Sequence, residues 1–164
     1  MSIIARQFEE KDLKSCAEIW NEVVRDGVAF PQIDEMTEEE ALSFFLSQSY
    51  TGVAENSETG DIVGLYILHP NNVGRCGHIS NASYAVKGTE RGKGIGRALV
   101  SHCIKTAPAC GFKILQFNAV VATNSRALAL YKSLGFTRLG VIPKGFLLPD
   151  GSYEDIIPHY ITLE

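Results

Sequence analysis

The sequence is poor in cysteine and has no excess of basic charge. Its four cysteines show no C-x-x-C spacing and no histidine at metal-ligand offsets, which argues against a metal centre. Lysine and arginine number 15 against 19 aspartates and glutamates, and the basic residues form no stripe. We therefore expect no metal and no nucleic-acid partner, and we interpret the cysteines as buried free thiols in a reducing compartment.

Long apolar runs are also missing. No segment approaches the roughly 18 apolar residues that a membrane span requires, and residues 1–6 lack the basic-then-apolar layout of a signal peptide. We therefore expect a cytoplasmic protein with no membrane partner. The 164 residues contain no repeat, low-complexity segment or linker, which predicts a single domain over residues 1–164.

The residue pattern alternates between strand and helix periodicity, with turn residues between the segments. Residues 143–150 are expected to form a long loop, and the charged segment 37–40 a capping box at a helix start. Helices are predicted at 12–25, 37–49, 95–107 and 124–135, and strands at 3–8, 50–56, 61–69, 78–86, 114–121, 137–142 and 156–163.

A glycine-rich segment, residues 91–97, connects a predicted strand to a predicted helix. Glycines at every second position remove side-chain bulk, so that the backbone N–H groups can face one ligand. The following helix N-terminus adds unpaired N–H groups and the positive end of its dipole. With the charges of Lys93 and Arg97, the segment predicts an anion site, and a diphosphate is the best fit.

Two common nucleotide fingerprints do not match this segment. In a G-x-G-x-x-G reading the third glycine would fall on Arg97 or on Leu99. In a P-loop reading Gly88 lies one residue too close to Gly92-Lys93, and Gly94 occupies the place of the required hydroxyl residue. The diphosphate must therefore belong to another class of ligand.

The segment instead resembles the pyrophosphate loop of the GCN5-related N-acetyltransferases, [Q/R]-x-x-G-x-[G/A], with Arg91, Gly94 and Gly96 in place. Residues 124–136 resemble the second signature of that family, N-x-x-A-x-x-x-Y-x-x-x-G-F. Asn124 and Gly135 are also good helix-cap residues. Capping does not explain Tyr131, seven positions after the N-cap. Because the two signatures stand in the right order and spacing, the resemblance covers nearly the whole chain.

The resemblance implies an α/β fold, with a mixed, mostly antiparallel sheet of about six to seven strands flanked by about four helices. It implies acetyl-CoA as donor, and a strand before the loop that diverges from the next strand. In that opening, backbone groups of residues 84–86 would meet the pantetheine arm, and one N–H would polarise the acetyl carbonyl. The cofactor-binding residues implied are Tyr84, Ala85, Val86, Arg91, Gly92, Lys93, Gly94, Ile95, Gly96, Arg97, Asn124, Ala127 and Tyr131.

The resemblance assigns catalysis to Tyr131, as the acid that protonates the departing thiolate. A phenol with a pKa near 10 is protonated at neutral pH and can serve; the alternative is a packing residue. Phosphinothricin-type relatives carry Glu-His on the strand before the loop, where this chain has Ser80 and Asn81. Ordered water, His78, Glu154 or Asp155 therefore remain as candidates for the base, with water first.

The acceptor side is less constrained. Phe30, followed by Pro31, looks exposed in the connection between the first two helices, which covers the acceptor site in this type of enzyme; it could also be a hinge. Asn81, Asn118 and Asn124 resemble positions of the L-azetidine-2-carboxylate N-acetyltransferases. Asn81 and Asn118 would then hold an acceptor carboxylate, and Asn124 would contact the pantetheine. Alternatively, the asparagines bond the strand backbone where the strands diverge.

These observations predict acetyl-CoA-dependent N-acetylation of a small-molecule amine, such as an amino acid or an analogue, by direct transfer in a ternary complex. Protein N-terminal or lysine acetylation is an alternative, which the acidic net charge and the side chains of Phe30 and Phe146 disfavour. A non-catalytic acyl-CoA sensor is another, which Tyr131 disfavours. A homodimer is a further expectation.

Overall fold

The computed structural model describes residues 1–164, which form four α-helices and nine β-strands. The helices are α1 Leu13–Asp26, α2 Glu38–Ser47, α3 Ile95–Thr106 and α4 Ser125–Ser133. The strands are β1 Ile3–Gln7, β2 Tyr50–Asn56, β3 Ile62–Pro70, β4 Ile79–Val86, β5 Ile114–Phe117, β6 Thr137–Arg138, β7 Ile142–Leu147, β8 Tyr153–Ile156 and β9 His159–Thr162.

Seven strands form the main sheet, in the order β1-β2-β3-β4-β5-β9-β6, and β7 and β8 form a separate two-stranded ribbon. Every pairing in the main sheet is antiparallel except that of β4 with β5, which is parallel. The expectation of a mixed, mostly antiparallel sheet with four flanking helices is confirmed.

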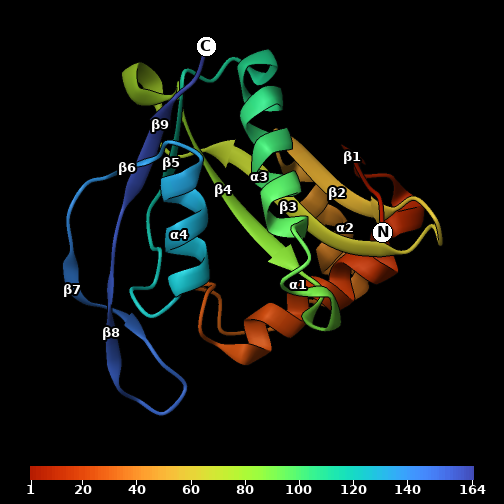
Figure 1. Ribbon diagram of the computed structural model, residues 1–164, viewed down its shortest axis with the longest axis horizontal. Coiled ribbons are helices and arrows are strands. Elements are labelled where there is room, and N and C mark those ends of the chain that lie inside the picture. The colour runs from red at the N-terminus through yellow and green to blue at the C-terminus, as the bar shows by residue number, and fades with distance from the viewer.

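The helices cover both faces of the sheet because its strands are apolar on both sides. Residues of α3 and α4 pack in front of the sheet, and α2 lies behind it (Figure 1). Alternate residues of β4 serve the two layers, since Ala82 packs with α3 while Ala85 packs with α1 and α2. The predicted capping box at Thr37 and Glu40 starts α2.

The C-terminal third differs from the prediction. Residues 143–150 are not a loop throughout, since β7 and β8 form a hairpin around residues 148–152. Pro143 and Gly145 conceal this strand in the sequence, and an edge ribbon tolerates them. The expected strand 156–163 is divided at Pro158 into the end of β8 and β9. The expected strand 114–121 ends at Phe117.

The early end of β5 creates the opening on which the site depends. The parallel ladder joins β4 and β5 only from Ile79↔Ile114 to Asn81↔Gln116. Beyond Asn81, β4 continues to Val86 while still paired with β3 on its other edge. The backbone of residues 82–86 therefore faces a gap where a strand neighbour would otherwise lie.

Gly52 on β2 provides a test of the packing behind this opening. It lies opposite Tyr66 of β3, and a Cβ at Gly52 would overlap the Tyr66 ring. We expect Gly52→Ala to lower the free energy of unfolding by about 1–3 kcal/mol, the usual cost of overpacking, measured by denaturant titration. The double variant Gly52→Ala/Tyr66→Leu should lose less than the sum of the single variants. Strictly additive losses would show that the ring is not the obstacle.

Candidate active site

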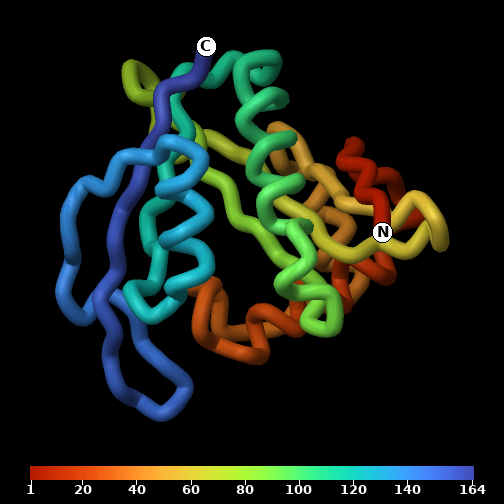
Figure 2. Tube along the Cα trace, viewed as in Figure 1, coloured from red at the N-terminus to blue at the C-terminus, as the bar shows by residue number.

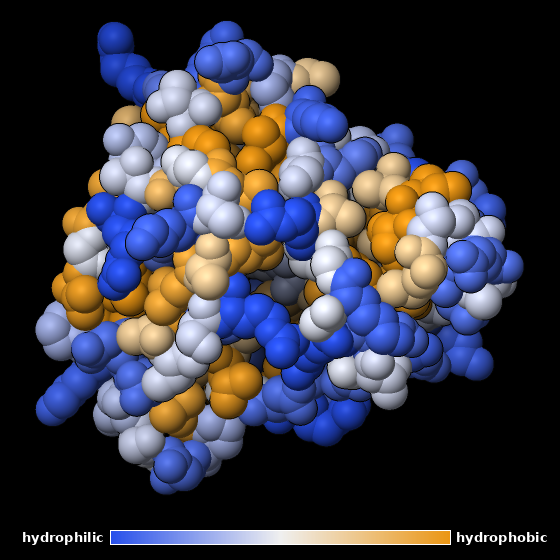
Figure 3. Space-filling view, in the orientation of Figure 1, coloured by the Kyte–Doolittle hydropathy of each residue, from blue (hydrophilic) through white to orange (hydrophobic).

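A cavity of about 720 Å³ lies at the gap between β4 and β5. Its walls come from β4, the glycine loop with the start of α3, the first turns of α4, and the end of α1 with the residues that follow it. Figure 3 shows the hollow near the middle of this face, with hydrophilic side chains on its rim. The cavity therefore joins the two sequence signatures in space.

The glycine loop forms one wall of this cavity. Gly92 and Gly94 have φ values of +80° and +82°, a conformation that favours glycine. Gly94 precedes α3 directly, and a Cβ there would meet no protein atom within 4 Å. The backbone at the helix N-terminus is thus open toward the cavity. Its N–H groups and dipole suit a phosphate group, so the site fits a ligand with a diphosphate.

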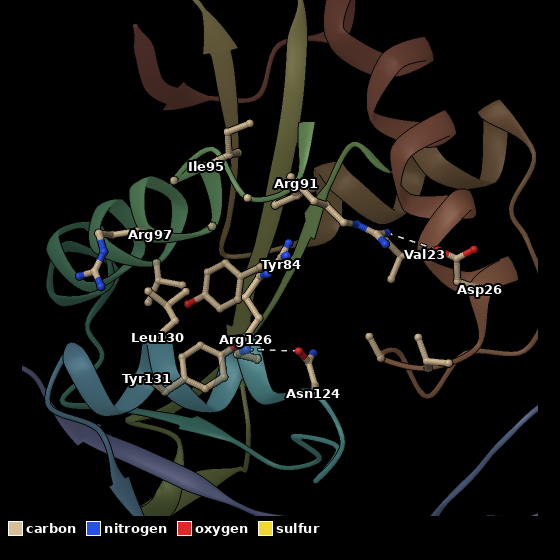
Figure 4. Close-up of a pocket in the computed structure, with 18 of the residues that line it drawn as sticks. Val23, Asp26, Tyr84, Arg91, Ile95, Arg97, Asn124, Arg126, Leu130 and Tyr131 are labelled. Carbon is tan, nitrogen blue, oxygen red and sulfur yellow. Dashed lines mark hydrogen bonds and ion pairs between the residues drawn. The ribbon is translucent and has the colours of Figure 1, made fainter. Parts of the chain in front are cut away.

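The charged side chains around the loop are partly engaged within the protein. Arg91 donates to Asp26 at the end of α1 (Nη2–Oδ2 3.3 Å), as Figure 4 shows. Glu22, one turn earlier, accepts a 2.6 Å hydrogen bond from the backbone N–H of Gly88. Arg97 donates to the Ser133 hydroxyl at the end of α4, at 2.7 Å. These contacts fix the loop between α1 and α4.

Tyr131 lies on the opposite wall, in an aromatic cluster. Its ring centroid is 4.6 Å from that of Phe117, 5.5 Å from Phe136 and 5.7 Å from His159. The hydroxyl forms no hydrogen bond within the chain, and burial raises the pKa of the phenol above its usual value. Tyr131 therefore stays protonated throughout the neutral range and can donate a proton in the cavity.

Comparison with known proteins agrees with this geometry. The acetyltransferase (GNAT) family model matches residues 13–136, which include both signatures. The chain belongs to this family. The family assignment confirms the resemblance that the two signatures indicated, the enzyme class and acetyl-CoA as the acetyl donor.

Among curated relatives, "N-acetyltransferase aca1" of Schizosaccharomyces pombe is 34% identical over 149 residues, which are 82% of this chain and 71% of that protein. Among solved structures, a GCN5-related N-acetyltransferase from Kribbella flavida is 33% identical with a TM-score of 0.89, over 98% of both chains. A phosphinothricin acetyltransferase from Sinorhizobium meliloti, solved with acetyl-CoA, shares the fold (TM-score 0.90, 24% identity, 99% of this chain and 89% of that one).

Most of the acetyltransferase residues expected from the sequence line the cavity. These are Tyr84, Val86, Arg91, Gly92, Gly94, Ile95, Gly96, Arg97, Asn124, Ala127 and Tyr131. Asn124 also caps α4, because its side chain accepts from the backbone N–H of Ala127 at 3.2 Å. Two expected residues lie off the wall. The Ala85 side chain packs against the α1–α2 layer, and Lys93 pairs with Glu90 at 2.6 Å.

Phe30 is not an exposed lid. It is 6% exposed and lies against Trp20, with 4.4 Å between ring centroids. The prediction of an exposed side chain is therefore wrong, and the alternative of an apolar hinge agrees with the packing. Phe146 is also buried, beside Val121 and Ile156. Removing a phenylalanine side chain from water is favourable, so both rings pack in the interior and are not exposed at the site.

The two strand asparagines are bonded within the chain. Asn81 donates from Nδ2 to the carbonyl oxygen of Gln116 (2.9 Å), at the last rung of the β4–β5 ladder. Asn118 is exposed and exchanges amide hydrogen bonds with Asn71, at 2.7 and 3.2 Å. Neither lines the cavity. These bonds agree with the alternative that the asparagines serve a structural role. Asn81 still has its Oδ1 atom and one N–H without a partner in the chain.

None of the three side chains considered as the base lines the cavity. His78 is exposed before β4. The Asp155 carboxylate accepts from the backbone N–H of Lys144 at 3.0 Å, where Lys144 has a φ of +57°. Asp155 therefore stabilises the unusual backbone of the β7–β8 ribbon.

Eight wall residues were not predicted from the sequence: Val23, Asp26, Val28, Ala29, Val100, Thr123, Arg126 and Leu130. Four of them come from the end of α1 and the residues after it. That segment carries no signature, and its approach to the loop depends on tertiary contacts. Arg126 lies inside the second signature, at a position that the motif leaves open, and its charge was the available signal.

No helix is both long and apolar enough to cross a membrane, and no cluster of three or more potential metal ligands is present. All four cysteines are unpaired, with Cys16 and Cys103 buried and Cys76 exposed. Burial raises the pKa of the Cys103 thiol to about 12, and raises that of Cys16 still further. Neither buried thiol is ionised at neutral pH.

We therefore expect iodoacetamide to modify Cys76 first, and to leave Cys16 and Cys103 unmodified until the protein unfolds. Peptide mass spectrometry of the treated native protein measures this, with urea-unfolded protein as the control. Cys76→Ser should keep full transferase activity. Rapid alkylation of Cys103 in the native state, with loss of activity, would contradict this description of the site.

Proposed function

We propose that this acetyltransferase transfers the acetyl group of acetyl-CoA to the amine of a small molecule. The observation that supports a small acceptor is a contact between two loops. Gly27, directly after α1, lies against Pro149 at the tip of the β7–β8 hairpin, so close that a Cβ at Gly27 would be 2.6 Å from Pro149 Cγ. Figure 2 shows the hairpin tip beside the segment that follows α1.

This contact limits access from the acceptor side. The segment after α1 contributes Val28 and Ala29 to the cavity wall, and in this family the connection between the first two helices covers the acceptor. We propose that the contact between that connection and the hairpin narrows the opening on the acceptor side. Such an opening suits a compact amine better than an extended polypeptide.

On the donor side, the glycine loop would bind the diphosphate, and the free edge of β4 would bind the arm that carries the thioester. Acetyl-CoA supplies an acetyl group activated as a thioester. We propose that backbone groups of residues 84–86 on this edge hold that arm and polarise the carbonyl group. The apolar residues Val86, Ile95 and Leu130 line the cavity and would exclude water from the bound arm.

Tyr131 would act as the general acid. Its raised pKa keeps the proton on the phenol, and its hydroxyl has no competing partner in the chain. Proton donation to the departing thiolate then completes a direct transfer. The burial and raised thiol pKa of Cys16 and Cys103 support a direct transfer rather than an acyl-cysteine route. With no carboxylate of the predicted set on the cavity wall, we propose that water removes the proton from the amine.

The first prediction concerns the acid. Tyr131→Phe should lower kcat by roughly 10²–10⁴-fold, the scale of general acid catalysis, while the affinity for CoA changes little. The raised pKa of Tyr131 also predicts how activity depends on pH. The phenol loses its proton only as pH rises through its folded pKa, which lies above the ordinary value. The wild-type enzyme should therefore keep this catalytic step at least up to about pH 10. Thiol release, followed at saturating acceptor, measures both.

Phe136→Leu is a suitable comparison, since it removes a neighbouring ring but no proton donor. An unchanged kcat in Tyr131→Phe would assign Tyr131 to packing and protonation of the thiolate to water.

A second prediction concerns the acceptor. We propose that the amine belongs to an amino acid or an analogue. Although neither Asn81 nor Asn118 lines the cavity, we propose that both contact the acceptor carboxylate, Asn81 through the N–H that Gln116 leaves free. Acceptors with a free carboxylate should then react faster than their methyl esters. Asn81→Ala should lose roughly 1.5–3 kcal/mol of transition-state binding, or about one to two decades in kcat/KM, yet keep CoA affinity. A panel of imino acids, amino acids, esters, polyamines and short peptides measures this by CoA release.

Asn72→Ala is the matched control, because this exposed asparagine bonds only the backbone N–H of Val73; it should keep the same preference for free acids over esters. Equal rates for acids and esters would return Asn81 and Asn118 to structural roles. Peptides preferred over every small amine would favour the protein N-terminal or lysine acetyltransferase. Tight acetyl-CoA binding with no turnover on any amine would favour the acyl-CoA sensor. A homodimer and a cytoplasmic location also remain predictions.

A further inference from the structure

Three arginines line the cavity, and two of them are already engaged with other side chains. Arg91 pairs with Asp26 at 3.3 Å and lies 4.0 Å from Glu22. Arg97 donates to Ser133. Arg126 forms no hydrogen bond and no ion pair within the chain, although it is exposed and lines the same cavity. It is the one arginine of the cavity wall whose donors are all free.

A cation at the position of Arg126 does not stabilise the helix that carries it. It is the second residue of α4, whose first turn contains no acidic residue. The positive end of the helix dipole disfavours a guanidinium there. The charge therefore has no stabilising partner in the protein itself, whereas an anion in the cavity would provide one.

The side chain extends from α4 to the glycine loop. Its two terminal nitrogens lie 3.9 and 4.0 Å from the point where a Cβ on Gly92 would stand. Figure 4 shows Arg126 reaching across the cavity from α4 in the direction of Arg91. The guanidinium therefore lies beside the loop backbone, and a ligand in the cavity that both residues line can contact the guanidinium and the loop together.

We infer that Arg126 supplies the side-chain charge that binds the diphosphate of the donor, from the side opposite the loop's backbone N–H groups. A planar guanidinium can bind two phosphate oxygens at once. Arg91, by contrast, holds the loop against α1 through Asp26. This assignment rests on acetyl-CoA as the donor, and it is independent of the identity of the acceptor.

The same helix carries Tyr131, which gives the contact a second role. A donor whose diphosphate is held by Arg126 is aligned along α4, with its thioester end toward the aromatic cluster around Tyr131. Arg126 is therefore a donor-positioning residue as well as a binding one. Donors without a diphosphate should not benefit from it.

Isothermal titration of CoA, dephospho-CoA and pantetheine, without any acceptor, tests the inference. Arg126→Gln should weaken CoA and dephospho-CoA alike, by about tenfold for a lost charge-assisted contact at a partly exposed site. It should leave the affinity for pantetheine unchanged, because pantetheine carries no phosphate. Arg126→Lys should recover part of the loss, and Arg91→Gln should lose less CoA affinity than Arg126→Gln.

Lys132→Gln is the matched control, since Lys132 is an exposed cation on the same helix but off the cavity wall; it should bind CoA as the wild type does. A loss seen with CoA but not with dephospho-CoA would overturn the assignment in favour of the 3′-phosphate. Equal CoA affinity in Arg126→Gln and wild type would refute any contact. Absence of CoA binding in the wild type would overturn the donor assignment as well, whereas failure of every acceptor would leave this result intact.

Discussion

The divergence of β4 from β5 after a three-residue parallel ladder is the constraint on which the rest of the site depends. A sheet with this order would normally satisfy both edges of an inner strand. Here β4 keeps β3 on one edge and loses its neighbour on the other, so that its backbone groups are available to a ligand. Asn81 stands at the last rung and bonds across it to Gln116. An amide at that position closes the ladder and leaves the following residues open.

The glycine loop, like the open edge of β4, presents backbone groups that have no partner in the secondary structure. The N-terminus of α3 presents N–H groups that no helical partner can satisfy, and Gly94 keeps the approach to them open. Two of the charges around the loop are paired with acidic residues, Arg91 with Asp26 and Glu22, and Lys93 with Glu90. Exposed ion pairs of this kind add little stability. Their effect is to fix the loop in place before a ligand arrives, so that less ordering is needed on binding.

The sequence predicted the parts of the site whose residues lie together in the chain. The glycine loop, the Asn124 cap and Tyr131 stand in two continuous motifs, and the structure places them around one cavity. It failed where the determining contacts are tertiary. Phe30 looked exposed beside Pro31, yet Trp20 buries it. The β7–β8 ribbon was hidden because Pro143 and Gly145 weaken a strand signal, while Asp155 holds the backbone at Lys144 in its left-handed conformation.

The end of α1 contacts two segments that lie far apart in the sequence. Glu22 bonds the backbone at Gly88, Asp26 pairs with Arg91, and Gly27 lies against Pro149 of the hairpin. Within two helical turns, one helix end thus contacts the segment that carries the glycine loop and the tip of the β7–β8 hairpin. Displacing this helix end would disturb the glycine loop and the hairpin at once, because one helix end holds the contacts to both. The end of α1 therefore fixes the position of the loop relative to the hairpin, although the two lie far apart in the sequence.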